Sequence, residues 1–181
     1  MSRYAFVASI ASISALIGAG AATAATPSLV IAGDEKIGSF AVKADGSLGG
    51  AIRAFGRPKL RRTGEACRAT WAPYGLTMSF YNLGSANPCT PAFGRFSRAV
   101  MHGTRWRTDK GLRVGMASTR VRRYYPRATF HRGLRLYWPS GWWLVTRREL
   151  FGGSGTYPGL LAETARGRVV ALHVRYPAGG D

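Results

Sequence analysis

The sequence predicts an α+β protein made of two tandem repeats, each a short helix followed by an antiparallel β-meander, with the meanders placed to share one continuous sheet. First, apolar residues recur twice at helical spacing. Second, segments of strand character separated by Gly- and Pro-containing turns follow each predicted helix. Third, 46% of the residues are hydrophobic and 12% aromatic, which suffices for a packed core.

The N-terminal segment has the pattern of a secretory signal peptide over residues 1–25. Arg3 precedes an uncharged apolar run, and Ala22-Thr23-Ala24 follows as a cleavage signal, which places cleavage near Ala24 or Ala25. A retained anchor is the alternative, because the run approaches the ~18–20 residues that span a bilayer. Ser and Gly interrupt the run and favour cleavage. We therefore expect a secreted or envelope protein whose mature chain has no transmembrane segment.

The first repeat is expected over residues 26–104. Its helix carries an apolar stripe of Leu48, Ala51, Ile52 and Phe55. Asp45 and Ser47 offer N-cap oxygens, and Gly56-Arg57-Pro58 ends the helix. Strands are expected at residues 68–71, 76–83 and 96–101, where apolar and polar residues largely alternate.

The second repeat is expected over residues 105–177, with residues 178–181 as a tail. Its helical stripe consists of Val114, Ala117, Val121 and Tyr124 or Tyr125, and Pro126 ends it. Strands are expected at residues 135–138, 142–146, 160–164 and 169–176, with a Gly-rich loop at residues 151–158. Neither unit buries much surface alone, so the two are expected to pack on a common core.

The only cysteines, Cys67 and Cys89, predict a disulfide, because an even pair in an exported protein is usually oxidised. The bond would close a loop of about 20 residues and stabilise the fold by ~3 kcal/mol. A metal or redox site is the alternative. The spacing is not C-x-x-C and no His lies between the cysteines, which favours the disulfide.

These short motifs resemble a family of tandem-repeat proteins. The matching residues are Gly111-Leu112-Arg113-Val114-Gly115-Met116, Val121, Tyr125-Pro126, Leu48, Ile52, Phe55-Gly56-Arg57-Pro58, Trp71 and Trp142-Trp143. They resemble the secreted beta-lactamase inhibitory proteins and the outer-membrane assembly lipoproteins of the SmpA/OmlA type, over residues 37–176. The resemblance implies a non-catalytic scaffold whose sheet and loops hold a partner. The strong positive charge and the absence of a lipid-anchoring Cys depart from these relatives.

The formal charge of +18 favours an anionic partner, either an envelope polymer or an acidic extracellular protein, rather than nucleic acid. Adjacent residues of a strand point to opposite faces, so either Trp142 or Trp143 leaves the core if both are in a strand. An exposed Trp beside Arg147 would be a binding centre. The alternative is that a helix covers one face and a second sheet or loop covers the other, so that neither Trp is available to a partner. The predicted anion- or partner-binding residues are Arg120, Arg122, Arg123, Arg127, Arg147, Arg148, Trp142 and Trp143. Arg57, Lys59, Arg61 and Arg62 form a second basic cluster. A solvated basic face is the alternative.

Enzyme signatures are weak, so we predict no catalytic residues, no metal and no cofactor. The three His residues lie far apart, and Gly152-Gly153-Ser154-Gly155-Thr156 lacks the final Gly of G-x-S-x-G. The expected function is a secreted non-catalytic binding protein for an extracellular or envelope macromolecule. One alternative is a small hydrolase of wall or glycan substrates, with a carboxylate pair such as Asp109 and Glu149. The other is a non-specific electrostatic binder of anionic surfaces.

Overall fold

The computed structural model describes residues 28–33, 35–132, 141–149 and 156–176. The helices are α1 (Leu48–Phe55), α2 (Val121–Tyr124) and the 3-10 turns Ala72–Tyr74 and Ser118–Arg120. The strands are β1 (Val30–Ala32), β2 (Lys36–Ile37), β3 (Phe40–Ala41), β4 (Lys59–Thr63), β5 (Ala66–Trp71), β6 (Leu76–Tyr81), β7 (Arg95–Met101), β8 (Arg107–Thr108), β9 (Thr129–His131), β10 (Trp142–Glu149), β11 (Thr156–Ala165) and β12 (Arg168–Arg175). The protein is thus α+β, with much more strand than helix.

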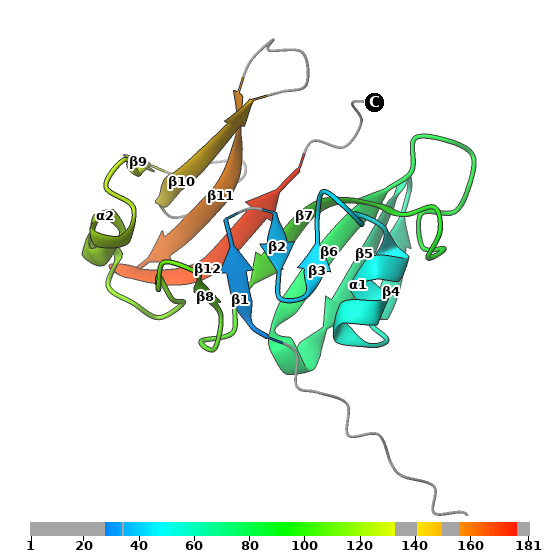
Figure 1. The fold of residues 1–181 in the computed structure, drawn as a ribbon, viewed down its shortest axis with the longest axis horizontal. Coiled ribbons are helices and arrows are strands. Elements are labelled where there is room, and N and C mark those ends of the chain that lie inside the picture. The colour runs from blue at the N-terminus through cyan, green and yellow to red at the C-terminus, as the bar shows by residue number, and fades with distance from the viewer. Residues whose placement is uncertain (1–27, 34, 133–140, 150–155, 177–181) are drawn as a thin grey trace, which may run out of the picture.

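Eight strands form one antiparallel sheet in the order β4-β5-β6-β7-β12-β11-β10-β9. Strands β4 to β7 follow α1 in the chain, and strands β9 to β12 follow α2. The two sets meet where β7 pairs with β12, with Val100 opposite His173. The sheet therefore runs without a break from the first half of the chain to the second (Figure 1).

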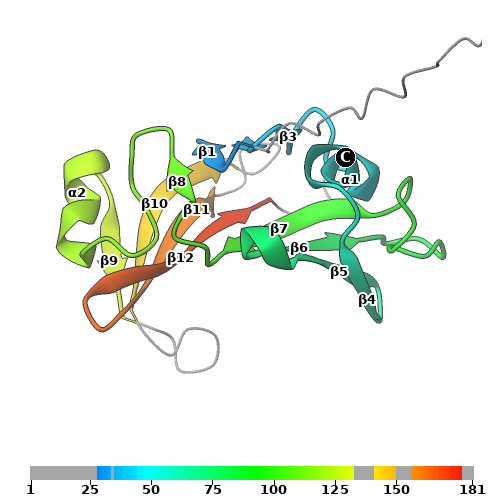
Figure 2. The same ribbon diagram turned by 90° about the horizontal axis from the view of Figure 1, so that it is seen from below.

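A second sheet of four short strands has the order β3-β2-β1-β8. Strand β1 pairs in parallel with β8, and this pairing ties the start of the described chain to the segment between the two halves. Figure 2 shows α1, α2 and this small sheet on the same side of the large sheet. The core lies between them and the large sheet. No described helix lies on the other face, but Leu144, Leu161, Ala171 and His173 on that face, in β10 to β12, are buried.

Side chains that alternate along the large sheet build the core. The inward positions include Cys67, Ala69, Trp71, Leu76, Met78, Phe80, Ala99, Met101, Leu172 and Val174, all buried. Trp106 is fully buried, and its indole N–H donates to the Tyr74 carbonyl at 2.7 Å. The ring of Phe55 lies 5.7 Å from that of Trp71 and 6.3 Å from that of Trp106. One hydrophobic cluster extends from Ile31 to Val174, so both halves share it.

The prediction for the first helix is confirmed. Ser47 is the N-cap, and its hydroxyl accepts a hydrogen bond from the Gly50 N–H at 3.0 Å. Leu48, Ala51 and Phe55 of the stripe are buried. Gly56 ends the helix with a φ of 80°, a conformation that glycine adopts without steric cost.

The prediction for the second helix is wrong over its first half. The helical segment begins with the 3-10 turn at Ser118 instead of Val114, and α2 proper is a single turn. Gly115 has a φ of 91°, which a helix does not allow. Its N–H donates to the Val169 carbonyl, and the Met116 carbonyl accepts from the Val169 N–H, so this segment pairs with the start of β12. Local spacing does not reveal this distant partner.

Most of the predicted strands are present in the structure. The predictions and their strands are 68–71 (β5), 76–83 (β6), 96–101 (β7), 142–146 (β10), 160–164 (β11) and 169–176 (β12). Strand β4, strand β9 and the small sheet were not predicted, because most of them are only two or three residues long. The predicted loop at residues 151–158 ends earlier than expected, since β11 begins at Thr156. The signal peptide, the strand at 135–138 and the tail lie outside the described residues.

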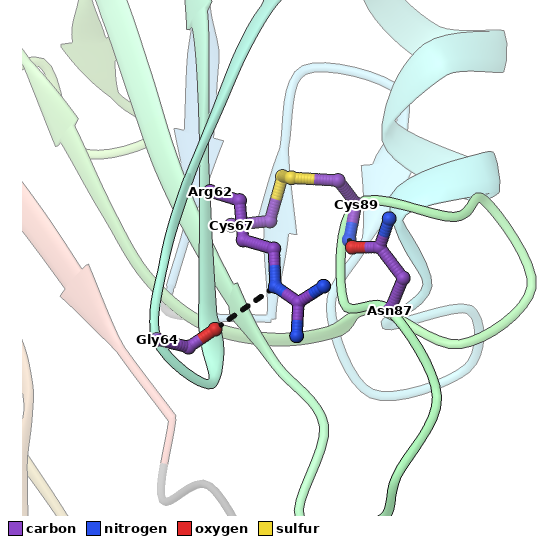
Figure 3. The surroundings of a disulfide bond; sticks show 5 residues. All are labelled: Arg62, Gly64, Cys67, Asn87 and Cys89. Carbon is purple, nitrogen blue, oxygen red and sulfur yellow. Dashed lines mark hydrogen bonds between the residues drawn. A yellow bond between two sulfur atoms is a disulfide. The ribbon is translucent and has the colours of Figure 1, made fainter.

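The predicted disulfide is present. Cys67 on β5 is joined to Cys89 in the connection between β6 and β7, with 5.0 Å between their Cα atoms (Figure 3). The Asn87 side chain accepts from the Cys89 N–H at 3.0 Å and so shapes the loop at the bond. The bond therefore fixes this long connection to the sheet. Among the described residues, no helix has the length and apolar character needed to cross a membrane.

Candidate anion-binding surface

Four arginines and a serine stand in one line across five adjacent strands of the large sheet. Arg61 of β4 lies opposite Arg68 of β5, and Arg68 lies opposite Ser79 of β6. Ser79 lies opposite Arg98 of β7, which lies opposite Arg175 of β12. We call these five residues the arginine row. Neighbouring strands are about 4.8 Å apart, so the row spans about 19 Å.

The arginine row points away from the core. Directly opposed residues of antiparallel strands have their side chains on the same face. Cys67, Ala69 and Ala99, which flank the arginines in the chain, are fully buried on the helix side. Arg61, Arg68 and Arg98 are exposed, whereas Arg175 is half-buried and Ser79 is buried at the base of the row. The row therefore lies on the face that the described helices do not cover.

The positive charge of the row is poorly compensated within the described part of the chain. There, no carboxylate lies within salt-bridge distance of Arg61, Arg68 or Arg98. The contact that Arg98 makes is with Ser79, from Nε to the hydroxyl oxygen at 3.4 Å. Burial and the nearby charge of Arg98 both lower the pKa of Arg175. Like charges directly opposite one another destabilise a sheet, so the free protein maintains this line at a cost.

Hydroxyl groups and further cations flank the row on the same face. On one side the paired residues are Lys59, Thr70, Thr77 and Val100. On the other side they are Thr63, Ala66, Tyr81 and Arg95. Lys59 and Arg95 are exposed. This half of the face thus offers charged and neutral hydrogen-bond donors, the groups that bind oxyanions.

The other half of the same face is chemically different. Trp142 of β10 lies between Glu163 and His131, and its ring stacks on that of His131 at 4.6 Å and 16°. Nε2 of His173 lies 3.0 Å from Oε2 of Glu163. Burial lowers the pKa of His173, although Glu163 opposes this effect. The hydrogen bond from His173 lowers the pKa of Glu163. This half carries a carboxylate and aromatic rings where the other carries arginines.

The structure divides the predicted site residues between two faces. Trp143 packs on the helix side, where the Arg122 guanidinium lies 5.5 Å and the Phe130 ring 5.2 Å from its ring. Trp142 points to the open face, in accord with the alternation argument. Arg120, Arg123, Arg127 and Arg147 are exposed. Arg148 lies in β10, opposite Tyr157. The residues at α2 therefore form a surface separate from Trp142, and their role in binding remains a prediction.

Asp109, one member of the carboxylate pair considered for a hydrolase, makes contacts at its own turn. Asp109 Oδ1 accepts the Lys110 N–H at 2.9 Å and lies 3.4 Å from the Tyr125 hydroxyl, which donates to it. These contacts give Asp109 a role in shaping its turn. The side chain of Glu149, its proposed partner, lies outside the described part. No group of three or more His, Cys, Asp or Glu residues that could hold a metal occurs in the described ranges.

Sequence reasoning named Arg61 within a basic cluster but did not select Arg68, Arg98 or Arg175 as site residues. Each of the three occupies an outward position in an alternating strand, a signal present in A-C-R-A-T-W and R-F-S-R-A-V-M. That they stand in one line follows from the strand register, which depends on pairing between distant segments.

Neither family models nor curated proteins nor solved structures contain a match to this chain. Function is therefore inferred from the sheet surface.

Proposed function

We propose that this protein is a secreted, non-catalytic binding protein that holds an anionic macromolecule outside the cell or at its envelope. The observation that carries the proposal is the arginine row, because a line of cations is complementary to a line of negative charge, and Arg61, Arg68 and Arg98 have no carboxylate within salt-bridge distance in the described part of the chain. The ligand would lie on the open face of the large sheet.

Three further features support this proposal. The apolar leader over residues 1–25 and the disulfide suit a protein that works in an oxidising compartment outside the cytoplasm. The net charge of +18 attracts anionic partners over long range. The continuous sheet is a rigid support, so its side chains are held in fixed relative positions before the ligand arrives.

The proposal also concerns the relationship between the two halves of the large sheet. Each half has a helix followed by four strands in consecutive order, and the halves meet at their last strands, β7 and β12. We propose that they are two copies of one unit, as in the tandem-repeat proteins that the sequence resembles. In this arrangement the arginine row extends from the first copy onto β12 of the second, whereas Leu144, Leu161 and Ala171 on the same face of the second copy are buried.

Binding of the mature, disulfide-intact protein to isolated cell-envelope fractions tests the proposal. One variant combines Arg61→Gln, Arg68→Gln and Arg98→Gln. Its matched control combines Arg113→Gln, Arg123→Gln and Arg127→Gln, which remove the same charge from exposed positions outside the row. We expect the row variant to lose about tenfold or more in affinity and the control to lose about threefold or less.

Equal losses in the two variants would contradict the proposal. That result would favour the alternative of a non-specific electrostatic binder, for which the number of charges matters and their position does not. Because the control includes Arg123 and Arg127, the same experiment also compares the row with the predicted surface at α2.

A further inference from the structure

We infer that the ligand of the arginine row is a linear polymer bearing phosphate groups, which lies across the strands and contacts β4, β5, β7 and β12 together. This inference rests on the proposed function and narrows it to one class of ligand. The geometry of the row, its donor groups and the small apolar content of its surroundings point to this ligand.

The row consists of two arginine pairs separated by a serine. Arg61 and Arg68 are direct neighbours, as are Arg98 and Arg175, and Ser79 stands between the pairs. The spacing of strands puts the centres of the two pairs about 14 Å apart and the two ends about 19 Å apart. A single small anion cannot contact both ends. Only a ligand with several anionic groups along an extended chain can occupy the whole row.

The donors of the row suit phosphate. The guanidinium group presents a planar fork of N–H donors that fits two oxygens of a phosphate group, and the row contains Arg and no Lys. The hydroxyls of Ser79, Thr70 and Thr77 lie on the same face and can donate to further oxygens of a tetrahedral group. A bound anion would also offset the repulsion between Arg98 and Arg175.

The surroundings of the row favour a polymer over a folded acidic protein. The centre of a protein–protein interface is usually poor in charge and rich in aromatic residues. Around Arg61, Arg68 and Arg98 the neighbours are mainly cations and hydroxyls, with Val100 and Tyr81 as the larger apolar groups. Beside Arg175 the same flank continues into His173 and the buried Leu161. Contacts to phosphate backbones are made by this mixture of arginine, serine and threonine.

The test measures the affinity of the mature protein for orthophosphate, tripolyphosphate and long-chain polyphosphate, with polyglutamate of matched charge as the carboxylate polymer. We expect affinity per phosphate to rise at least about tenfold once the chain reaches both arginine pairs, because the second contact becomes intramolecular. Polyglutamate is expected to bind at least about tenfold more weakly than long-chain polyphosphate, since a carboxylate presents two coplanar oxygens whereas a tetrahedral phosphate also directs oxygens toward donors outside that plane.

Variants with one substitution in each arginine pair make the test specific. Arg61→Gln and Arg98→Gln should each lower the affinity for long-chain polyphosphate about tenfold. Each should lower the affinity for orthophosphate by about twofold at most. Arg61→Lys with Arg98→Lys keeps the charge and should lose several-fold affinity, because Lys lacks the bidentate fork. Arg113→Gln is the off-row control. Urea midpoints and an intact disulfide establish that every variant is folded.

The inference is overturned if affinity per phosphate does not depend on chain length, if polyglutamate matches polyphosphate, or if Arg113→Gln weakens binding as much as Arg61→Gln. These outcomes do not contradict the proposed function as long as binding to envelope fractions still depends on the arginines of the row. Loss of the row dependence in the envelope assay overturns the proposed function itself, so the two failures are distinguishable.

Discussion

Arg98 stands directly opposite Arg175 where β7 meets β12, at the junction between the two halves of the large sheet. Arg175 is half-buried there, and both burial and the charge of Arg98 lower its pKa. An opposed pair of like charges weakens strand pairing, whereas most cross-strand pairs strengthen it. The proposed anionic ligand would favour this pair, because a bound anion offsets the repulsion between the two guanidinium groups.

Replacing Arg98 with Gln should therefore raise the free energy of unfolding at low salt by about 0.2–1 kcal/mol while weakening anion binding. The gain should shrink as salt increases, because screening already reduces the repulsion. Urea denaturation at two ionic strengths measures both effects. Arg113→Gln reports the general effect of removing one positive charge. A loss of stability that is independent of salt would show that the Arg98–Ser79 hydrogen bond matters more than the repulsion.

The two neighbouring tryptophans should respond differently to truncation. Trp143→Ala removes a ring that packs on the core between Arg122 and Phe130, and should cost about 3 kcal/mol of stability. Trp142→Ala removes a ring stacked on His131 on the open face, and should cost about 1 kcal/mol. Thermal unfolding of both variants checks the order. A larger cost for Trp142 would mean that the open face contributes more to stability than its position indicates.

Much of the fold follows from local pattern. The stripe of α1 is fixed by its 3.6-residue period, and the alternation in β5 to β7 separates inward from outward residues. The length and start of α2 do not follow from local pattern, because Gly115 and Met116 are held by Val169, more than fifty residues away. Strand β4, with every residue exposed, carries no hydrophobic period at all.

The arginine row is harder to predict from local sequence than the helices and strands are. A basic composition predicts an anionic partner, but it cannot say which arginines act together. Arg98 and Arg175 are neighbours in the row only because β7 pairs with β12, a contact between strands that are far apart in the sequence. Arg122 contacts Trp143 and not Trp142, since the pleat turns adjacent residues to opposite faces.

Removal of the disulfide should lower stability by about 3 kcal/mol, because the bond closes a loop over a sequence separation of 22 residues. The double variant Cys67→Ala with Cys89→Ala avoids mispaired thiols and can be compared by urea denaturation with the oxidised protein. Reduction of the wild-type protein should produce a similar loss. Because the arginine row lies on the opposite side of β5 from Cys67, anion affinity of the folded variant should change by less than about twofold.

The pair of His173 and Glu163 should make the protein less stable in mild acid. The pKa of His173 is lowered from its usual 6.5, mainly by burial, so the unfolded chain takes up a proton at a higher pH than the folded protein does. The pKa of Glu163 is lowered from 4.5 by its hydrogen bond to His173, so the free energy of unfolding falls further once the pH drops below that usual value. We expect the free energy of unfolding to fall as the pH is lowered from about 7.5 to about 5. His173→Gln removes the titrating group and should flatten this decline, whereas His102→Gln, at an exposed histidine nearby, should retain most of it. Urea denaturation across the pH range measures the slopes. Equal slopes in His173→Gln and the wild type would show that another group governs the acid response.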